Sequence, residues 1–185
     1  TELIEYYKGI FTILSSCASR QLEEVTFRRT VIPVQELLDT AGKYFKKSMK
    51  NRSERIELEI EPMEAKVIGD VNQLRFLLEN LIDEALTVRE DGVIRLQARQ
   101  DNEYIRFLFT DTRREKSVEE LNQLFYPNLA RMTSGEKGEL RGTEYLVCKQ
   151  IIRDHDEFAG RRGCRINAEP AEGGGFTVYF TIPRR

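Results

Sequence analysis

Hydrophobic residues recur along the chain with two different periods, one typical of helices and the other of half-buried strands. Spacings of three and four residues place side chains on one helical face, whereas strict alternation places them on one face of a strand. Helical spacing covers residues 34–49, 70–86, 118–125 and 145–152, and alternation covers 25–32, 56–60, 94–98, 105–109, 164–168 and 176–182. Helices interleaved with hairpin-connected strands predict a two-layer α/β sandwich of the α+β kind, with a mixed and mostly antiparallel sheet.

The first residues carry a separate heptad-like stripe formed by Leu3, Tyr7, Ile10, Leu14 and Cys17. The stripe lasts barely two heptads, which is too short to define what covers it. Either this N-terminal helix packs on the domain that follows, or it is the end of a longer helical stalk that dimerises upstream.

The overall charge is nearly balanced, because 29 lysines and arginines against 31 aspartates and glutamates give a net charge of −2. A chain without a basic excess has no electrostatic field that would gather nucleic acid or an anionic membrane surface. No apolar run approaches the ~20 residues that span a bilayer, and the first residues show no signal-peptide pattern. These observations predict a cytoplasmic protein without nucleic-acid partners and without a membrane segment in this chain.

His155 is the only histidine in the chain. One histidine excludes multi-histidine metal sites and leaves a single candidate for histidine phosphorylation. It follows the 145–152 helix, where a histidine usually interacts with the helix C-terminus, so we do not expect a phosphoacceptor role. Cys17, Cys148 and Cys164 are odd in number and form no CxxC pair, which indicates reduced and mostly buried thiols.

Six short segments occur in the order and spacing of a known family: a Gly-Asp pair, then NLIDEAL, FTDT, LFYP, CKQII and GGGFTVYFTIP. In this combination the chain resembles the ATP-binding domain of two-component sensor histidine kinases. That histidine-kinase-like ATPase (GHKL) domain has the Bergerat fold shared with gyrase, so the resemblance implies a sheet covered by helices on one face. It covers residues 26–185, whereas residues 1–25 resemble the end of the dimerisation and phosphotransfer hairpin. An acceptor histidine, if the protein has one, is then expected upstream of Thr1.

The family's N box reads NLxxNAxK, with two asparagines on one face of the helix. Asn80 matches the first asparagine, and Asp70 lies at the spacing that the family requires before it. The second asparagine, which holds Mg²⁺ against the triphosphate in the family, is replaced by Glu84, and the following lysine by Thr87. A carboxylate can ligate Mg²⁺, so Glu84 remains a candidate metal ligand, although its charge would repel a polyphosphate.

The family's first glycine box reads DxGxG, and this chain has Asp111-Thr112-Arg113-Arg114-Glu115 in its place. Asp111 therefore matches the aspartate that accepts a hydrogen bond from the adenine amino group. Arg113 and Glu115 replace the glycines, whose missing side chains allow the backbone to approach a ligand closely.

The second glycine box should read GxGxG before a helix whose N-terminus binds phosphates. Only Gly142 remains, with Leu140 and Glu144 at the flanking glycine positions. The glycine-rich segment 128–142 that contains it is expected to be a mobile loop.

Thr177 matches the family's threonine that supports the adenine aspartate, so the adenine end of the pocket is retained in sequence while the metal and phosphate end is rewritten. Isolated buried charges are costly, so we expect Arg113 or Arg114 to close the pocket by pairing with one of the new carboxylates. Those carboxylates are Glu84, Glu115 and Glu144. The vestigial nucleotide-binding positions are Asn80, Glu84, Asp111, Arg113, Gly142 and Thr177.

Phosphoryl transfer depends on positioning and charge neutralisation, and those positions have changed. We therefore expect a pseudokinase, a degenerate ATP-binding domain that acts as a non-catalytic module in two-component signal transduction. Two alternatives stay open: an active sensor kinase with unorthodox ATP and Mg²⁺ ligands, and an adenine-nucleotide sensor that uses Asp111 and Thr177 without hydrolysis. The resemblance implies ATP or ADP with Mg²⁺ as cofactor, although no cofactor is certain. Expected partners are an adenine nucleotide, a response regulator or the protein's own upstream sensor region, and a second copy bound through upstream helices.

Overall fold

The computed structural model describes residue 4 and residues 27–127, 133–134 and 140–185. The heptad-like stripe, Cys17 and most of the glycine-rich loop lie outside these residues. The elements are β1 Thr30–Pro33, α2 Val34–Met49, β2 Ile56–Ile60, β3 Lys66–Gly69, α3 Val71–Leu86, β4 Gly92–Asp101, β5 Tyr104–Asp111, α4 Val118–Asn122, β6 Thr133–Ser134, β7 Leu140–Arg141, α5 Glu144–Phe158, β8 Ile166–Pro170 and β9 Phe176–Pro183.

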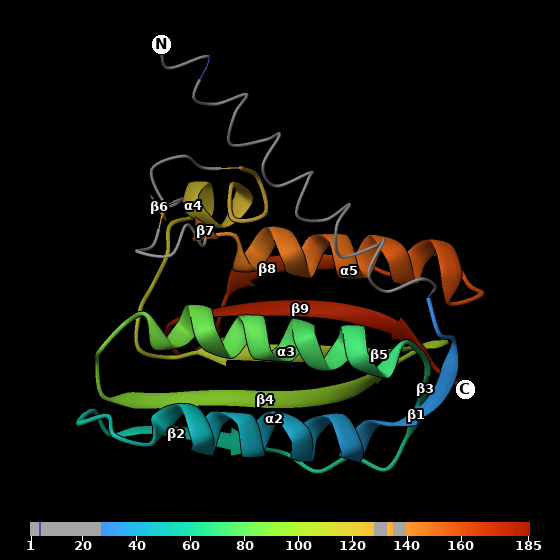
Figure 1. The fold of residues 1–185 in the computed structure, drawn as a ribbon, viewed down its shortest axis with the longest axis horizontal. Helices are drawn as coiled ribbons and strands as arrows, with labels where there is room; N and C mark the ends of the chain where they lie inside the picture. Colours follow the sequence, from blue (N-terminus) through green and yellow to red (C-terminus); the bar gives the residue numbers. More distant parts are fainter. Residues whose placement is uncertain (1–3, 5–26, 128–132, 135–139) are drawn as a thin grey trace.

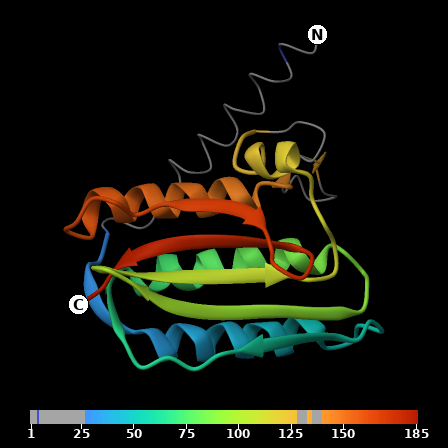
Figure 2. The ribbon, with the colours of Figure 1, turned by 180° about the vertical axis from the view of Figure 1, so that it is seen from behind.

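The main sheet has five strands in the order β2-β4-β5-β9-β8. Strand β2 runs parallel to β4, and the other neighbours are antiparallel. Helices α2, α3 and α5 lie on one face of this sheet (Figure 1), and the view from behind shows the opposite face without a helical layer (Figure 2). This arrangement confirms the expected sandwich with helices on one face of a mostly antiparallel sheet.

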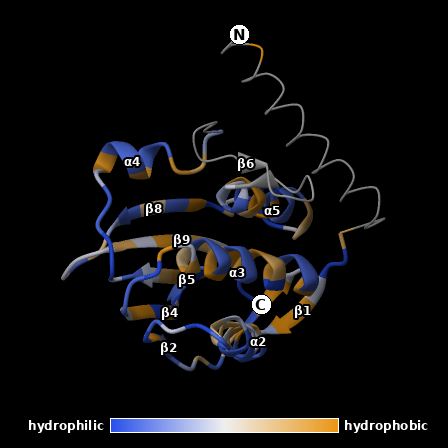
Figure 3. Cartoon of the chain, turned by 60° about the vertical axis from the view of Figure 1, so that its left-hand side comes forward, coloured by the Kyte–Doolittle hydropathy of each residue, from blue (hydrophilic) through white to orange (hydrophobic). Residues whose placement is uncertain are grey.

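The core lies between the sheet and its helices, as the alternation of hydrophobic residues requires. Phe107 and Phe180 occupy paired positions on β5 and β9, and their rings stack with centroids 4.8 Å apart. Leucines of α3 in the helical layer belong to the same core cluster and are almost fully buried. Hydrophobic and polar positions alternate visibly along β8 and β9 in Figure 3.

Helix α3 begins where the sequence places it, because Asp70 caps its N-terminus. The carboxylate of Asp70 accepts hydrogen bonds from the N–H groups of Asn72 and Gln73, which have no partner inside the helix. Helix α5 is longer than its hydrophobic spacing predicts. Its buried face continues beyond Ile152 through polar residues, so the hydrophobic pattern stops before the helix does.

Several strand assignments differ from the expected ranges. Strands β6 and β7 pair with each other inside the segment 128–142 that was expected to be a loop. Strand β3 was not identified, because four residues are too few to display an alternating pattern. Strand β8 covers Ile166–Pro170 instead of 164–168, and within the described residues β1 begins at Thr30. Alternation marks which side chains face the core, whereas strand ends are set by pairing with β9 and β3.

Cys148 and Cys164 are buried free thiols, as expected, and burial raises the pKa of Cys164 to about 12. No helix in the described part of the chain is both long enough and apolar enough to cross a membrane.

Candidate functional site

Asp111 is the last residue of β5 and lies on the helical side of the sheet, where it is 4% exposed. The glycine run before β9 passes directly beside it. Gly175 has a φ of +85°, and a Cβ there would collide with the carbonyl oxygen of Asp111. Glycine is therefore required at this position, both for the backbone conformation and for the close approach.

Arg113 lies two residues after Asp111 and folds back onto it. Its Nε and Nη2 donate to the two carboxylate oxygens of Asp111 at 2.9 Å each, and its backbone N–H donates to the same carboxylate at 3.0 Å. The two side chains are only 1% and 5% exposed. This is a bidentate, desolvated ion pair, the strongest form of arginine–carboxylate contact.

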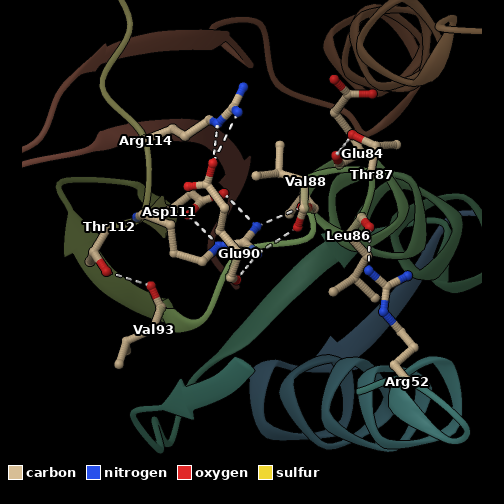
Figure 4. Close-up of polar contacts among 12 residues, drawn as sticks. Arg52, Glu84, Leu86, Thr87, Val88, Glu90, Val93, Asp111, Thr112 and Arg114 are labelled. Carbon is tan, nitrogen blue, oxygen red and sulfur yellow. Dashed lines mark hydrogen bonds and ion pairs between the residues drawn. The ribbon is translucent and has the colours of Figure 1, made fainter. Parts of the chain in front are cut away.

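The remaining guanidinium hydrogens reach backbone carbonyls in the last turn of α3 and in the segment that follows it. Nη2 donates to the carbonyl of Ala85 at 2.6 Å, and Nη1 donates to those of Val88 and Glu90 at 2.9 and 3.0 Å. All the N–H donors of the guanidinium therefore have acceptors. A cation at a helix C-terminus is also favoured by the helix dipole. Figure 4 shows the polar contacts of this region, with Asp111, Val88 and Glu90 labelled.

Gly92 provides the space for the Arg113 side chain. A Cβ at Gly92 would lie 2.6 Å from Cγ of Arg113, and its φ of +146° is one that other residues rarely adopt. The Asp91-Gly92 pair therefore does more than form a turn, because Gly92 packs directly against the side chain of Arg113.

The expected ion pairs were wrong in their partners. Arg113 pairs with Asp111, and Arg114 pairs with Glu90 at 3.0 Å, so neither of these pairs uses Glu84, Glu115 or Glu144. The Arg114–Glu90 pair is exposed to solvent, with 57% and 46% of its side chains accessible. The Arg113–Asp111 pair was not anticipated, because the resemblance had assigned Asp111 to the adenine. Arg113 engages both oxygens of the carboxylate that the resemblance assigned to adenine.

Thr177 does not support Asp111. Its hydroxyl hydrogen bonds to that of Thr110 at 2.7 Å, across the register pair that the two residues form. Neighbouring residues of a strand point to opposite faces, so Thr177 lies on the face away from Asp111. The residue opposite Asp111 on β9 is Phe176. The motif match assigned Thr177 a role beside Asp111, but its hydroxyl bonds to Thr110 on the other face of the sheet.

The side chain of Asn80 and the backbone of Glu84 form hydrogen bonds within α3 and its C-terminal cap. The Asn80 side chain is buried and donates from Nδ2 to the carbonyl of Phe76 at 2.8 Å. The backbone carbonyl of Glu84 accepts from the hydroxyl of Thr87 at 2.6 Å, which closes the last turn of α3. Among the described residues, no group of three or more His, Cys, Asp or Glu side chains could hold a metal ion. Glu84 therefore belongs to no metal-ligand cluster in that part of the chain.

The second glycine box places a carboxylate where the family binds phosphate. Gly142 has a φ of +83°, and α5 begins two residues later at Glu144. Oε2 of Glu144 is buried without a hydrogen-bond partner, and Thr143 provides no side-chain cap. A negative charge near a helix N-terminus is favourable, but a bound phosphate would meet this charge directly. Within the described residues, the start of α5 therefore carries a partly buried carboxylate where the family has a glycine.

His155 is a scaffold residue that joins α5 to the start of α3. It is fully buried, and its Nε2 accepts from the N–H of Asp70 at 3.1 Å. Nδ1 lies 2.8 Å from the carbonyl of Ile151, and it must therefore carry the proton and donate. Burial lowers the pKa of His155 to about 4. The expected interaction at the helix end is thus replaced by a neutral bridge between two helices.

Sequence reasoning missed two features of this region. The first is the reason for the glycine in the Gly-Asp pair. A Cβ at Gly69 would lie 2.8 Å from Nε2 of His155, so the packing of the histidine requires a glycine there. The second feature is the Arg113–Asp111 pair. The one signal for it was the basic residue at a glycine position two residues from a buried acid, which permits an ion pair without specifying it.

Comparisons with known proteins place the chain in a family. The family model described as histidine kinase-, DNA gyrase B- and HSP90-like ATPase matches residues 69–185. Among curated proteins, none matches the sequence.

Several solved structures share the fold. A mycobacterial sensor histidine kinase, MprB, is 20% identical, with a TM-score of 0.64 over 85% of this chain and 99% of its own. Histidine kinase AdeS of Acinetobacter baumannii is 13% identical, with a TM-score of 0.60 over 99% and 77%. Histidine kinase ThkA, solved in complex with the response regulator protein TrrA, is 19% identical, with a TM-score of 0.65 over 100% and 52%.

Proposed function

Because the chain belongs to the histidine kinase-, DNA gyrase B- and HSP90-like ATPase family, we propose that it is a degenerate histidine-kinase-type domain. It acts as a non-catalytic module in two-component signalling. The observation that supports this most directly is the buried Arg113–Asp111 pair, in which the chain's own guanidinium engages both oxygens of the carboxylate that the family uses for adenine.

The opposite end of the same pocket supports the proposal independently. Glu84 replaces the metal-binding asparagine, and Glu144 replaces a glycine at the helix that binds phosphates. Two added carboxylates raise the electrostatic cost of binding a triphosphate, whereas catalysis of phosphoryl transfer requires that charge to be neutralised. Adenine recognition and phosphate binding are therefore disfavoured for separate physical reasons.

The partner of such a module is a protein. The ThkA structure contains a response regulator, which makes a regulator of that class one partner for this chain. The protein's own upstream sensor region is the other, with dimerisation through upstream helices. In either case the domain contributes a folded surface and not a phosphoryl group.

Isothermal titration calorimetry tests the proposal with ATP, ADP and adenosine, each with and without Mg²⁺. We expect no binding heat from the wild-type chain with any of them. Arg113→Gly restores the family's glycine and frees Asp111, so adenosine should bind this variant and raise its melting temperature. Arg114→Ala is the matched control, because it removes a neighbouring arginine that is paired only at the surface.

Wild-type binding that tightens with phosphate number and Mg²⁺ would contradict the proposal and favour an active kinase. Wild-type binding of adenosine that phosphates do not improve would identify an adenine-nucleotide sensor instead. Either result would also mean that Arg113 leaves Asp111 at low energetic cost.

A further inference from the structure

A second pocket lies where α4 and α5 meet β8, the last strand in the order of the main sheet. Its volume is about 360 Å³, which is within the range of small-molecule sites. Its walls come partly from two segments that the proposed function leaves unused. The LFYP segment provides Phe125 and Tyr126, and the CKQII helix provides Lys149.

Aromatic side chains form much of the apolar lining of this pocket. Phe125 is buried and packs edge-on against Tyr145, with ring centroids 5.7 Å apart, so this part of the wall is fixed. The next residue, Tyr126, is 55% exposed although it is large and aromatic. Tyr179 of β9 is half-buried and lines the same pocket. Such rings offer flat surfaces on which another aromatic ring packs favourably.

Lys149 is the basic residue of the lining, and it has no counter-ion within the described residues. Its Nζ lies 4.6 Å from the centroid of the Tyr126 ring. Burial lowers the pKa of Lys149, and the like charge of Arg153 adds to this effect. A partly desolvated cation without a carboxylate partner is stabilised by an anionic group on a ligand.

Glu169 is the acidic residue of the lining, and it is exposed at β8. The cation nearest to this side of the pocket is Arg106, whose guanidinium lies 4.8 Å from the centroid of the Tyr179 ring. Arg106 pairs with Asp101 at 3.0 Å, and Glu169 forms no ion pair in the part of the chain that the structure describes. A purely anionic ligand would be repelled by Glu169, whereas a ligand with both charges satisfies Lys149 and Glu169 together.

We propose that this pocket binds a small zwitterion with an aromatic ring, either a free aromatic α-amino acid or a short peptide that carries one. The ligand carboxylate contacts Lys149, its ammonium contacts Glu169, and its ring packs against Tyr126 and Tyr179. The pocket shares no lining residue with the Arg113–Asp111 cluster, so this site does not depend on the fate of nucleotide binding.

Isothermal titration calorimetry on the whole chain tests the proposal with L-phenylalanine and with the dipeptide glycyl-L-phenylalanine. We expect saturable binding, and the tighter of the two probes identifies the source as a free amino acid or a peptide. N-acetyl-L-phenylalanine lacks the ammonium group and L-phenylalaninamide lacks the carboxylate. Each should bind at least tenfold more weakly than L-phenylalanine.

Variants assign each ligand charge to its residue. Lys149→Gln should weaken the binding of L-phenylalanine at least tenfold and abolish the difference between L-phenylalanine and its amide. Glu169→Gln should do the same for the N-acetyl derivative. Lys116→Gln is the matched control, because Lys116 also lies over an aromatic ring, that of Phe176 at 5.4 Å, but does not line the pocket. Glu172→Gln, in the exposed turn before β9, is the control for the acidic residue.

Circular dichroism identifies any variant that fails to fold, and Glu169→Gln, at an exposed side chain, keeps the test decisive if Lys149→Gln does. Absence of binding by both zwitterions, equal binding of the N-acetyl and amide derivatives to that of L-phenylalanine, or unchanged affinity in folded Lys149→Gln would overturn the proposal. A loss of affinity in Lys116→Gln equal to that in Lys149→Gln would also overturn it, because the effect would then be one of net charge.

Discussion

Helix α3 has a buried polar cluster at each end, and the two clusters have different consequences. At the N-terminus, Asp70 caps the helix and His155 accepts its N–H. At the C-terminus, Arg113 binds the last carbonyls and Asp111. Both clusters satisfy buried polar groups and connect distant segments. The first lies wholly in the scaffold, whereas the second lies where the family places its ligand. A well-satisfied network therefore stabilises the fold in either place, and under the proposed function the second network also competes with adenine binding.

The largest effect should come from removing the arginine. Arg113→Ala leaves Asp111 charged, buried and unpaired, and we expect the free energy of unfolding to fall by about 3–5 kcal/mol. Urea unfolding followed by circular dichroism measures the loss. Arg114→Ala should change stability by about 0.5 kcal/mol or less, because its pair is exposed. A comparable loss in both variants would mean that the buried ion pair contributes no more to stability than the exposed one.

The cluster at the N-terminus of α3 should respond to pH. The unfolded imidazole titrates near its usual pKa of 6.5, while burial lowers the native pKa of His155 to about 4. Between these values the unfolded chain binds a proton that the native chain does not. Stability is therefore fully present above pH 6.5 and falls by about 3 kcal/mol as the pH drops to about 4. In His155→Gln this part of the pH dependence should disappear, and a wild-type slope in that variant would assign it to other groups.

Two glycines separate backbone strain from crowding beside Asp111. Gly173 and Gly175 both have a φ of +85°, but a Cβ at Gly173 meets nothing within 4 Å. Gly173→Ala should cost about 1 kcal/mol through its backbone conformation alone. Gly175→Ala should cost about 2 kcal/mol more, because its Cβ would collide with the Asp111 backbone. Equal losses in thermal unfolding would show that the glycine run can move away from β5.

The smallest effect concerns Thr177, which is opposite Thr110 and not beside Asp111. Thr177→Val removes one hydrogen bond and should cost about 1 kcal/mol. When Thr177→Val is added to the Arg113→Gly variant, the affinity for adenosine should stay the same, as calorimetry would measure. A loss of affinity in the double variant would mean that Thr177 contributes to adenosine binding.

Much of the fold was accessible from the sequence. Hydrophobic spacing located α2, α3 and the β4–β5 hairpin closely, and the order of motifs indicated the family. The candidate site was harder, because a motif assigns a residue to a position without defining its hydrogen bonds. Asp111 was identified as a key residue, but its partner Arg113 was not. Thr177 was expected beside Asp111, whereas its side chain lies on the opposite face of the sheet.

The amino-acid sequence was sufficient to predict the two layers, the side of each strand that faces the core and the loss of the family's glycines. These features depend on local periodicity and residue identity. The folded chain was needed to show which acid Arg113 pairs with. That choice requires Asp111, Gly92 and the carbonyl end of α3 to meet, and they meet only when β4 and β5 pair beneath the helix. A guanidinium group binds where most of its N–H donors find acceptors, and tertiary packing determines where those acceptors lie.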